Sequence, residues 1–483
     1  MKKLLLCFIL AAILCGCAYS VENENVADDD QNCFAIIAGR EATVDGSVLF
    51  GHNEDDSGEQ MLNVYVCAPS LSSSFDMPYI PKYEGVKQET RTPAITNGIA
   101  NLDGKQNLKF IWAEFPGMSV ADAFMNEYGV AIASDGCNSK EDVYDLTDGG
   151  ILYGVRVSVA KYARSAKEGV KIIGELVEKY GYAGSGRTYC IADPYEGWIV
   201  AVVRGRHWIA QRVPDDKVMI IPNYYAITKV DLNDSENFIG SADIIEYAIK
   251  RGWYDPKRDG EFNFRVAYSS EKQLYSTGNT GRHEKALSYF TNGTYKYSNI
   301  TAEPMITPSG KVSLKDMINA LSIHDPQGNV KGHNGSICNG STVVSTIFQL
   351  RPTPDRERGC IMWMAPGKPC MTPYIPWYLA LKESPKYWHR YATWQEAEAK
   401  HYTHTFNKRE TYPNGKYWSY VDFYQKYKGD YADNAQKLTK ERDRVQNELF
   451  SSQPAFERDL GAVSREKASE MVLNLLDKYY GKK

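Results

Sequence analysis

The fold is decided by the stretch CFAIIAGREATVDGSVLFGHNED, which occupies residues 33–55. Residues 33–39 form an apolar run ending in glycine, and residues 47–51 form a second apolar run after the turn signal Asp45-Gly46. Two short apolar runs separated by turn residues are typical of a β-hairpin. The sequence therefore predicts a hairpin whose first strand begins on Cys33.

The register of this hairpin depends on the length of its connection. If the connection is residues 42–46, Glu41 faces Ser47 and Cys33 faces Asp55, whereas a two-residue connection places Gly58 opposite Cys33. Both registers bring the polar residues 52–56 close to the cysteine.

The first 17 residues have the features of an export signal. Two lysines precede an apolar run over residues 4–14, which is too short to span a bilayer but suits a secretory signal peptide. The following Leu14-Cys15-Gly16-Cys17 is similar to a bacterial lipobox with Cys17 as the lipidated residue. Cleavage near Ala18 by an ordinary signal peptidase is the alternative. The expected location is therefore export to the periplasm or anchoring as a bacterial lipoprotein, with Cys17 as the only membrane contact.

Residues 18–32 hold five acids and few large apolar side chains, which indicates a solvated propeptide or linker. The 483-residue chain carries a formal charge of −4. Without residues 1–32, which contain two of the 56 basic and five of the 60 acidic residues, 54 bases face 55 acids. A nearly neutral chain lacks the basic surplus that nucleic-acid binding requires, so no nucleic-acid partner is expected.

Beyond the hairpin, the pattern alternates between helices and strands. Ser165 and Glu168 open a helix that closes at Gly181, and a second capped helix is expected over residues 313–322. The apolar runs 187–192, 198–203 and 208–212 predict an antiparallel meander. We expect a catalytic domain over residues 33–390 and a helical region over residues 391–483.

Seven cysteines remain after the signal segment, and no C-x-x-C pair occurs among them. Zinc-ribbon, EF-hand, P-loop and H-E-x-x-H patterns are also missing from the sequence. His401 and His404 share a helical spacing in a Tyr- and Lys-rich region, for which surface exposure is the preferred interpretation. No metal and no cofactor are predicted.

Cys33 has a chemical option that the other cysteines lack. Cleavage between Asn32 and Cys33 would place a thiol and a free α-amine on one residue, and an α-amine with a pKa near roughly 7.7–8.0 accepts a proton at neutral pH. Nucleophile and base then need no histidine. The alternative is a buried apolar residue at the start of a strand, which is the usual role of a free cysteine.

Residues 33–47 and 51–55 resemble the opening of the cysteine-type dipeptidases of the N-terminal-nucleophile (Ntn) hydrolase superfamily, which includes the secernins. Further blocks are similar to that family in the same order; they are residues 126–131, 205–216, 221–223, 349–351 and 374–376. The resemblance covers most of residues 33–380. It implies an α+β fold, namely a four-layer αββα sandwich with the nucleophile at the tip of a central strand, here with a helical C-terminal appendage.

The resemblance also implies roles for individual residues. Cys33 takes the place of the nucleophile. The related choloylglycine hydrolases carry Arg-Asn-x-Asp, and here the positions are His52, Asn53 and Asp55, so Asp55 is expected to bond the α-amine. Asn223 matches an oxyanion-hole amide. The expected substrate-binding residues are His52, Asn53, Asn126 and Arg282.

Several of these positions also have plainer readings. Asp55 suits the end of a strand, Asn223 suits a turn after Pro222, and Asn126 suits an ordinary β-turn before Gly129. Arg265 competes with Arg282 for the place of the arginine that completes the site.

The predicted function is hydrolysis of dipeptides through a thioester acyl-enzyme, with small peptides as the binding partners. The first alternative is an Ntn amidase acting on N-acyl or bile-acid amides, which needs a larger apolar pocket. The second is a ligand-binding surface lipoprotein without catalysis, suggested by the lipobox and the 34 tyrosines. The sequence does not specify an oligomeric state.

Overall fold

The computed structural model describes residues 33–55, 62–69, 106–115, 120–147, 149–152, 154–295, 300–324, 336–392, 396–397, 417–427 and 431–480. The signal segment, the acidic linker and the pair His401 and His404 lie outside these residues. Within the described part of the chain, no helix is both long and apolar enough to cross a membrane.

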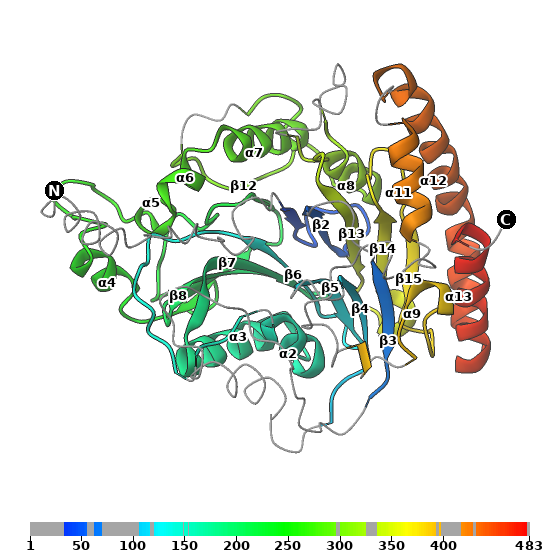
Figure 1. Ribbon diagram of the computed structural model, residues 1–483, viewed down its shortest axis with the longest axis horizontal. Coiled ribbons are helices and arrows are strands. Elements are labelled where there is room, and N and C mark those ends of the chain that lie inside the picture. The colour runs from blue at the N-terminus through cyan, green and yellow to red at the C-terminus, as the bar shows by residue number, and fades with distance from the viewer. Residues whose placement is uncertain are drawn as a thin grey trace, which may run out of the picture.

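Two antiparallel sheets form the centre of the molecule (Figure 1). The first sheet has seven strands, in the order β12 (Met305–Ile306), β10 (Val218–Ile221), β1 (Phe34–Ala38), β2 (Val48–Asp55), β13 (Thr342–Leu350), β14 (Ile361–Pro366) and β15 (Ile375–Tyr378). The second has eight, in the order β11 (Phe238–Gly240), β9 (Trp208–Val213), β8 (Gly197–Gly205), β7 (Tyr182–Ala192), β6 (Ala131–Gly136), β5 (Val120–Asn126), β4 (Phe110–Phe115) and β3 (Asn63–Cys67). The expected meander is thus confirmed as β7, β8 and β9.

Helices cover the outer face of each sheet (Figure 1). On the eight-stranded sheet lie α2 (Gly154–Tyr162) and α3 (Ala166–Tyr180), which share with it an apolar core containing Val170, Ile173 and Trp198. On the seven-stranded sheet lie α7 (Thr277–Phe290) and α8 (Leu314–Leu321). The predicted four-layer αββα sandwich is therefore confirmed.

Both capped helices form where their local signals place them. Ser165 accepts a hydrogen bond from the Glu168 backbone N–H, and Gly181 ends α3 with a φ of 77°, a conformation that suits glycine. Ser313 and Asp316 cap the start of α8 reciprocally.

The helices of the C-terminal region are α11 (Tyr417–Tyr427), α12 (Tyr431–Ala462) and α13 (Arg465–Tyr480). In α13, the apolar face carries Ala468, Val472, Leu476 and Tyr480, all buried. Tyr480 packs edge-on against Trp388 and donates a hydrogen bond to the Met364 carbonyl of β14. The predicted helical appendage thus packs on the β14–β15 side of the sandwich (Figure 1).

Short helices complete the connections: α4 (Ile244–Lys250), α5 (Phe264–Tyr268), α6 (Glu271–Leu274), α9 (Arg356–Gly359) and η3 (Lys386–Trp388).

The hairpin β1–β2 exists, but its predicted register was wrong. Phe34 faces Asn53, Ala35 faces His52 and the last pair is Ala38 with Leu49. Continuing this pairing by one step places Glu54, and neither Asp55 nor Gly58, opposite Cys33. The connection is longer than five residues because residues 39–42 bond to the backbone of Asp215 and Lys217 instead of to β2. A shift of one residue moves every side chain of a strand to the other face, so the choice of acid beside Cys33 changes.

Candidate active site

Cys33 lies immediately before β1, between the two sheets and wholly buried. Its Sγ donates a hydrogen bond to Glu54 Oε1 at 3.4 Å. This contact follows from the hairpin register, because residues that face each other across a ladder share a face of the sheet. The predicted nucleophile therefore touches a carboxylate of the neighbouring strand.

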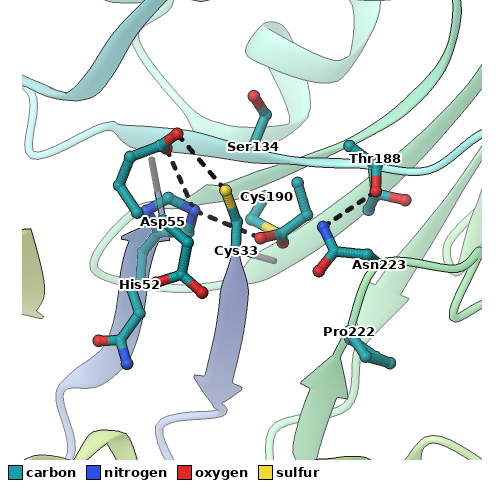
Figure 2. A network of polar contacts seen from close by, with 12 residues as sticks. Cys33, His52, Asp55, Ser134, Thr188, Cys190, Pro222 and Asn223 are labelled. Carbon is teal, nitrogen blue, oxygen red and sulfur yellow. Dashed lines mark hydrogen bonds and ion pairs between the residues drawn. The ribbon is translucent and has the colours of Figure 1, made fainter. Parts of the chain in front are cut away.

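His52 joins the two sheets at this point. Its Nε2 is 4.0 Å from Glu54 Oε2 and 3.4 Å from Oδ1 of Asp135, a residue of β6 in the opposite sheet. All three side chains are at most 2% exposed. Figure 2 shows His52 on one side of the Cys33 sulfur and Asn223 on the other.

The electrostatics of this group disfavour an isolated thiolate. Burial raises the pKa of the Cys33 thiol well above its ordinary value, and the negative charges of Glu54, Asp135 and Asp55 raise it further. A hydrogen bond from the Asp55 backbone N–H to the sulfur acts in the opposite direction. A thiolate here therefore needs a positive charge beside it.

Asp55 contacts the Cys33 sulfur through its backbone N–H and not through its carboxylate. Its side chain accepts a hydrogen bond from the Thr342 hydroxyl of β13. Burial raises the pKa of Asp55 to about 7, although that hydrogen bond and the positive charges of Arg282 and Lys368 oppose the shift. Asp55 is thus close to Cys33, but the carboxylate in contact with the sulfur is Glu54.

Asn223 and Arg282 hold the other side of the cysteine. Arg282 comes from α7; its Nη1 donates to the Cys33 carbonyl at 3.2 Å and its Nη2 donates to Asn223 Oδ1 at 2.8 Å. Asn223 Nδ2 donates to the Gly136 carbonyl at 3.0 Å, so β6 also fixes this amide. The structure therefore brings Cys33, His52, Asp55, Asn223 and Arg282 together.

The two candidate arginines have different partners. Arg265 is buried, and its guanidinium donates to the backbone carbonyls of Tyr225, Ala226, Ile300 and Ala302. It fastens loops, whereas Arg282 contacts the backbone of Cys33.

Two predicted substrate-binding residues lie outside the cluster. Asn53 points from the opposite face of β2, where Nδ2 donates to the carbonyls of Leu321 in α8 and Ile337. Asn126 donates to the carbonyls of Ala160 and Ala163 at the end of α2. Its Oδ1 accepts hydrogen bonds from the backbone N–H groups of Tyr128 and Val130, as expected for the alternative in which Asn126 belongs to a β-turn. Both amides serve the fold.

Two residues of the cluster were not predicted. Glu54 stands within the quoted stretch, and the correct hairpin register would have identified it. Asp135 has no local signal, because only the packing of β6 against the first sheet brings it to His52.

The cluster also contains metal-ligand chemistry. Cys33 Sγ, a His52 ring nitrogen and a Glu54 carboxylate oxygen all lie within 4.8 Å of one another. Thiolate, imidazole and carboxylate are the donors that zinc accepts in proteins.

The chain is similar to known proteins over most of its length. A sequence model described as peptidase family C69 matches residues 32–430. A probable dipeptidase of Latilactobacillus sakei is 28% identical over 374 residues, covering 72% of this chain and 74% of its own length. A probable dipeptidase of Salmonella dublin is 26% identical, and the alignment covers 72% of this chain and 81% of its own length. Probable dipeptidase A of Streptococcus pyogenes serotype M1 is 28% identical, and the alignment covers 74% of this chain and 76% of its own length.

Among solved structures, penicillin V acylase from Agrobacterium tumefaciens aligns with a TM-score of 0.36 and 11% identity, covering 72% of this chain and 86% of that one.

Proposed function

The chain belongs to peptidase family C69, and we propose that it is a cysteine-type dipeptidase whose nucleophile is Cys33. The observation that carries the proposal is the buried Cys33 Sγ, 3.4 Å from Glu54 Oε1, at the start of a central strand. The names of the relatives at 26–28% identity support the substrate class.

The proposed mechanism needs cleavage of the Asn32–Cys33 bond. The freed α-amine takes the proton of the Cys33 thiol, and the thiolate attacks the peptide carbonyl carbon. The resulting oxyanion accepts a hydrogen bond from the Asn223 amide. When the C–N bond breaks, the α-ammonium returns its proton to the departing amine and a thioester remains. Water, deprotonated by the same amine, then attacks the thioester and releases the acid and the thiol.

The electrostatics of the cluster support an amine as the base. Because burial and three carboxylates raise the pKa of the Cys33 thiol, the thiolate gains from a cation formed beside it. An α-ammonium is such a cation, and the negative charges of Glu54 and Asp135, which disfavour the thiolate, favour it. Arg282 holds the Cys33 carbonyl and so fixes the nucleophile's backbone.

The charged surroundings favour a dipeptide over an acyl amide. A dipeptide brings an ammonium and a carboxylate, and the cluster offers both the acids Glu54 and Asp135 and the base Arg282. An N-acyl or bile-acid amide instead presents a large apolar group, which gains nothing from buried charges.

The proposal also includes export and maturation. The signal segment 1–17 would carry the chain to the periplasm or anchor it through Cys17, and removal of residues 18–32 would free the Cys33 amine. An anchored, uncut chain would then be inactive, because the amine that catalysis requires is still part of a peptide bond.

The mature N-terminus tests this proposal. Intact mass and N-terminal sequencing of active protein should find Cys33 first, and a chain that starts Met-Cys33 should become active once the methionine is removed. Turnover would be measured on a panel of dipeptides and, in parallel, on N-acyl amino acids. Full activity in protein shown by mass to retain residues 18–32 would refute the amine as base.

A further inference from the structure

The cluster around Cys33 contains three side chains whose atoms can bind a metal ion. Cys33 Sγ, a His52 ring nitrogen and a Glu54 carboxylate oxygen converge within 4.8 Å, and all three residues are buried. Cys33 immediately precedes β1, and His52 and Glu54 lie in β2, so the paired backbones of one hairpin hold the three donors. The three donors therefore have a rigid scaffold, which a metal site requires.

The separations of these atoms suit a tetrahedral ion. Zinc bonds of about 2.0–2.3 Å hold neighbouring ligand atoms roughly 3.3–3.6 Å apart. Cys33 Sγ is 3.4 Å from Glu54 Oε1, and His52 Nε2 is 4.0 Å from Glu54 Oε2. The two distances involve different oxygens of Glu54, and the three donors as a set lie within 4.8 Å, so the side chains would have to close around an ion that binds all three. A set containing sulfur and imidazole selects zinc and similar borderline-soft cations over magnesium or calcium.

A fourth group, the acidic Asp135, lies beside the three donors. Asp135 is wholly buried, its Oδ1 accepts no hydrogen bond, and that oxygen lies 3.4 Å from His52 Nε2. A protonated His52 supplies the positive charge that this buried carboxylate needs, and a cation bound to His52 would lie next to the same carboxylate. On the other side, Arg282 donates to Asn223 and the Cys33 carbonyl, and Lys368 donates to the carbonyls of Gly340 and Thr342.

We propose that Cys33, His52 and Glu54 form a binding site for Zn²⁺, and that the metal-bound form is inactive because the ion occupies the nucleophilic sulfur. Binding replaces the thiol proton with the metal, so one proton is released for each ion bound. The site itself does not require the proposed dipeptidase function, but the inhibition rests on it. After cleavage before Cys33, the α-amine of the same residue could fill the fourth position, so mature protein should bind zinc more tightly than the uncut chain.

Cobalt and zinc titrations of the reduced, metal-free full-length protein test the site. One equivalent of Co²⁺ should bind and produce a thiolate-to-cobalt charge-transfer band, and Zn²⁺ should displace it. Zinc-edge X-ray absorption of the wild type should find one sulfur neighbour at about 2.3 Å among nitrogen and oxygen ligands. This measurement requires no variant and so does not depend on any variant folding.

Variants locate the ion. Cys33→Ala should abolish the cobalt band, while His52→Ala and Glu54→Gln should each weaken binding tenfold or more. Cys360→Ala is the matched control, because its Sγ is also buried but contacts the Arg351 carbonyl, and it should bind like the wild type. A cobalt band that persists in Cys33→Ala would overturn the site. So would two sulfur neighbours in the absorption data, which would assign the ion to a thiol pair such as the interacting Cys338 and Cys370.

The activity measurements separate this proposal from the function. If the protein hydrolyses dipeptides, one equivalent of Zn²⁺ should stop turnover and a chelator should restore it; full activity in zinc-loaded protein would refute the inhibition. If the protein binds zinc through Cys33 but hydrolyses no dipeptide, the metal site stands and the proposed function fails. If it hydrolyses dipeptides but shows no cobalt–thiolate band, the function stands and the metal site fails.

Discussion

The two faces of β2 differ in purpose although their residues alternate along one strand. Towards the other sheet, His52 and Glu54 approach Asp135 and the Cys33 sulfur. Towards α8, Gly51 lies so close that an added Cβ would be 2.8 Å from Leu321 Cδ1, and Asn53 bonds backbone carbonyls. One face holds reactive groups and the other holds the layers together.

This difference shows that the register of one hairpin decides which side chains can take part in the chemistry beside Cys33. A block such as His52 to Asp55 contains four polar residues, and a ladder presents every second one to the same side. Sequence similarity can identify the block, but only the pairing identifies the acid that meets the thiol. Variants of the two faces should therefore have different consequences.

The largest effect is expected for Cys33→Ala. Turnover of dipeptides should be lost entirely, because the variant lacks the proposed nucleophile, while the thermal unfolding temperature changes little since the removed group is one sulfur atom. The measurement is kcat/KM with the unfolding midpoint. Cys360→Ala removes a buried sulfur outside the cluster and should keep normal turnover. Activity in Cys33→Ala equal to that of the wild type would move the nucleophile elsewhere.

A direct comparison of the two neighbouring acids comes next. Glu54→Gln should lower kcat/KM by about 10²-fold, because it removes the carboxylate that favours the ammonium–thiolate pair. The same change should lower the pKa of the Cys33 thiol, since Glu54 raises it, and the pH dependence of iodoacetamide labelling would report this.

Asp55→Asn is the matched neutralisation one residue away. Its side chain is engaged by Thr342, so we expect a loss of kcat/KM of no more than about tenfold, since the Asp55 backbone N–H to the sulfur remains. A larger loss in Asp55→Asn than in Glu54→Gln would restore Asp55 as the principal acid.

The sequence predicted those features whose causes are local. The caps at Ser165 and Ser313, the helical stripe of α13 and the strands around Cys33 each depend on residues within one or two turns of chain. The family resemblance added the layer order, the proposed nucleophile Cys33 and Asn223. It left Arg265 and Arg282 in competition, and the structure places Arg282 against Cys33 and Asn223.

The remaining parts depend on long-range packing. The hairpin register is set by Asp215 and Lys217, which bond residues 39–42 from a different part of the chain. Asp135 enters the cluster because β6 of one sheet packs on β1 of the other. Asn53 and Asn126 were predicted to bind substrate because they are polar and lie in blocks that resemble the family. In the structure their side-chain amides donate to backbone carbonyls.

The outer face of β2 should affect stability more than catalysis. Asn53→Ala leaves the buried carbonyls of Leu321 and Ile337 without their 3.0 and 2.9 Å donors, which should cost about 1–3 kcal/mol of unfolding free energy. Chemical denaturation measures this, and kcat/KM of the folded variant should stay within about a factor of three. Asn233→Ala, at an exposed position, should change the unfolding free energy by less than about 0.5 kcal/mol. A collapse of activity in folded Asn53→Ala would return Asn53 to the site.

The last prediction concerns the pH dependence of stability. Burial raises the pKa of Asp55 from 3.8 to about 7, so between these values the folded protein keeps a proton that the unfolded chain has lost. Stability falls with rising pH wherever the folded state binds more protons, so this contribution is fully present below pH 3.8 and is lost as pH rises through about 7. At about 1.4 kcal/mol per pKa unit the change is bounded by roughly 4 kcal/mol. Asparagine at this position does not titrate, so the stability of the wild type relative to Asp55→Asn should decrease between pH 4 and pH 7 and then level off. Denaturant melts of both proteins across that range measure the difference, and a difference that rises with pH would show that Asp55 is ionised in the folded state and held by Arg282 and Lys368.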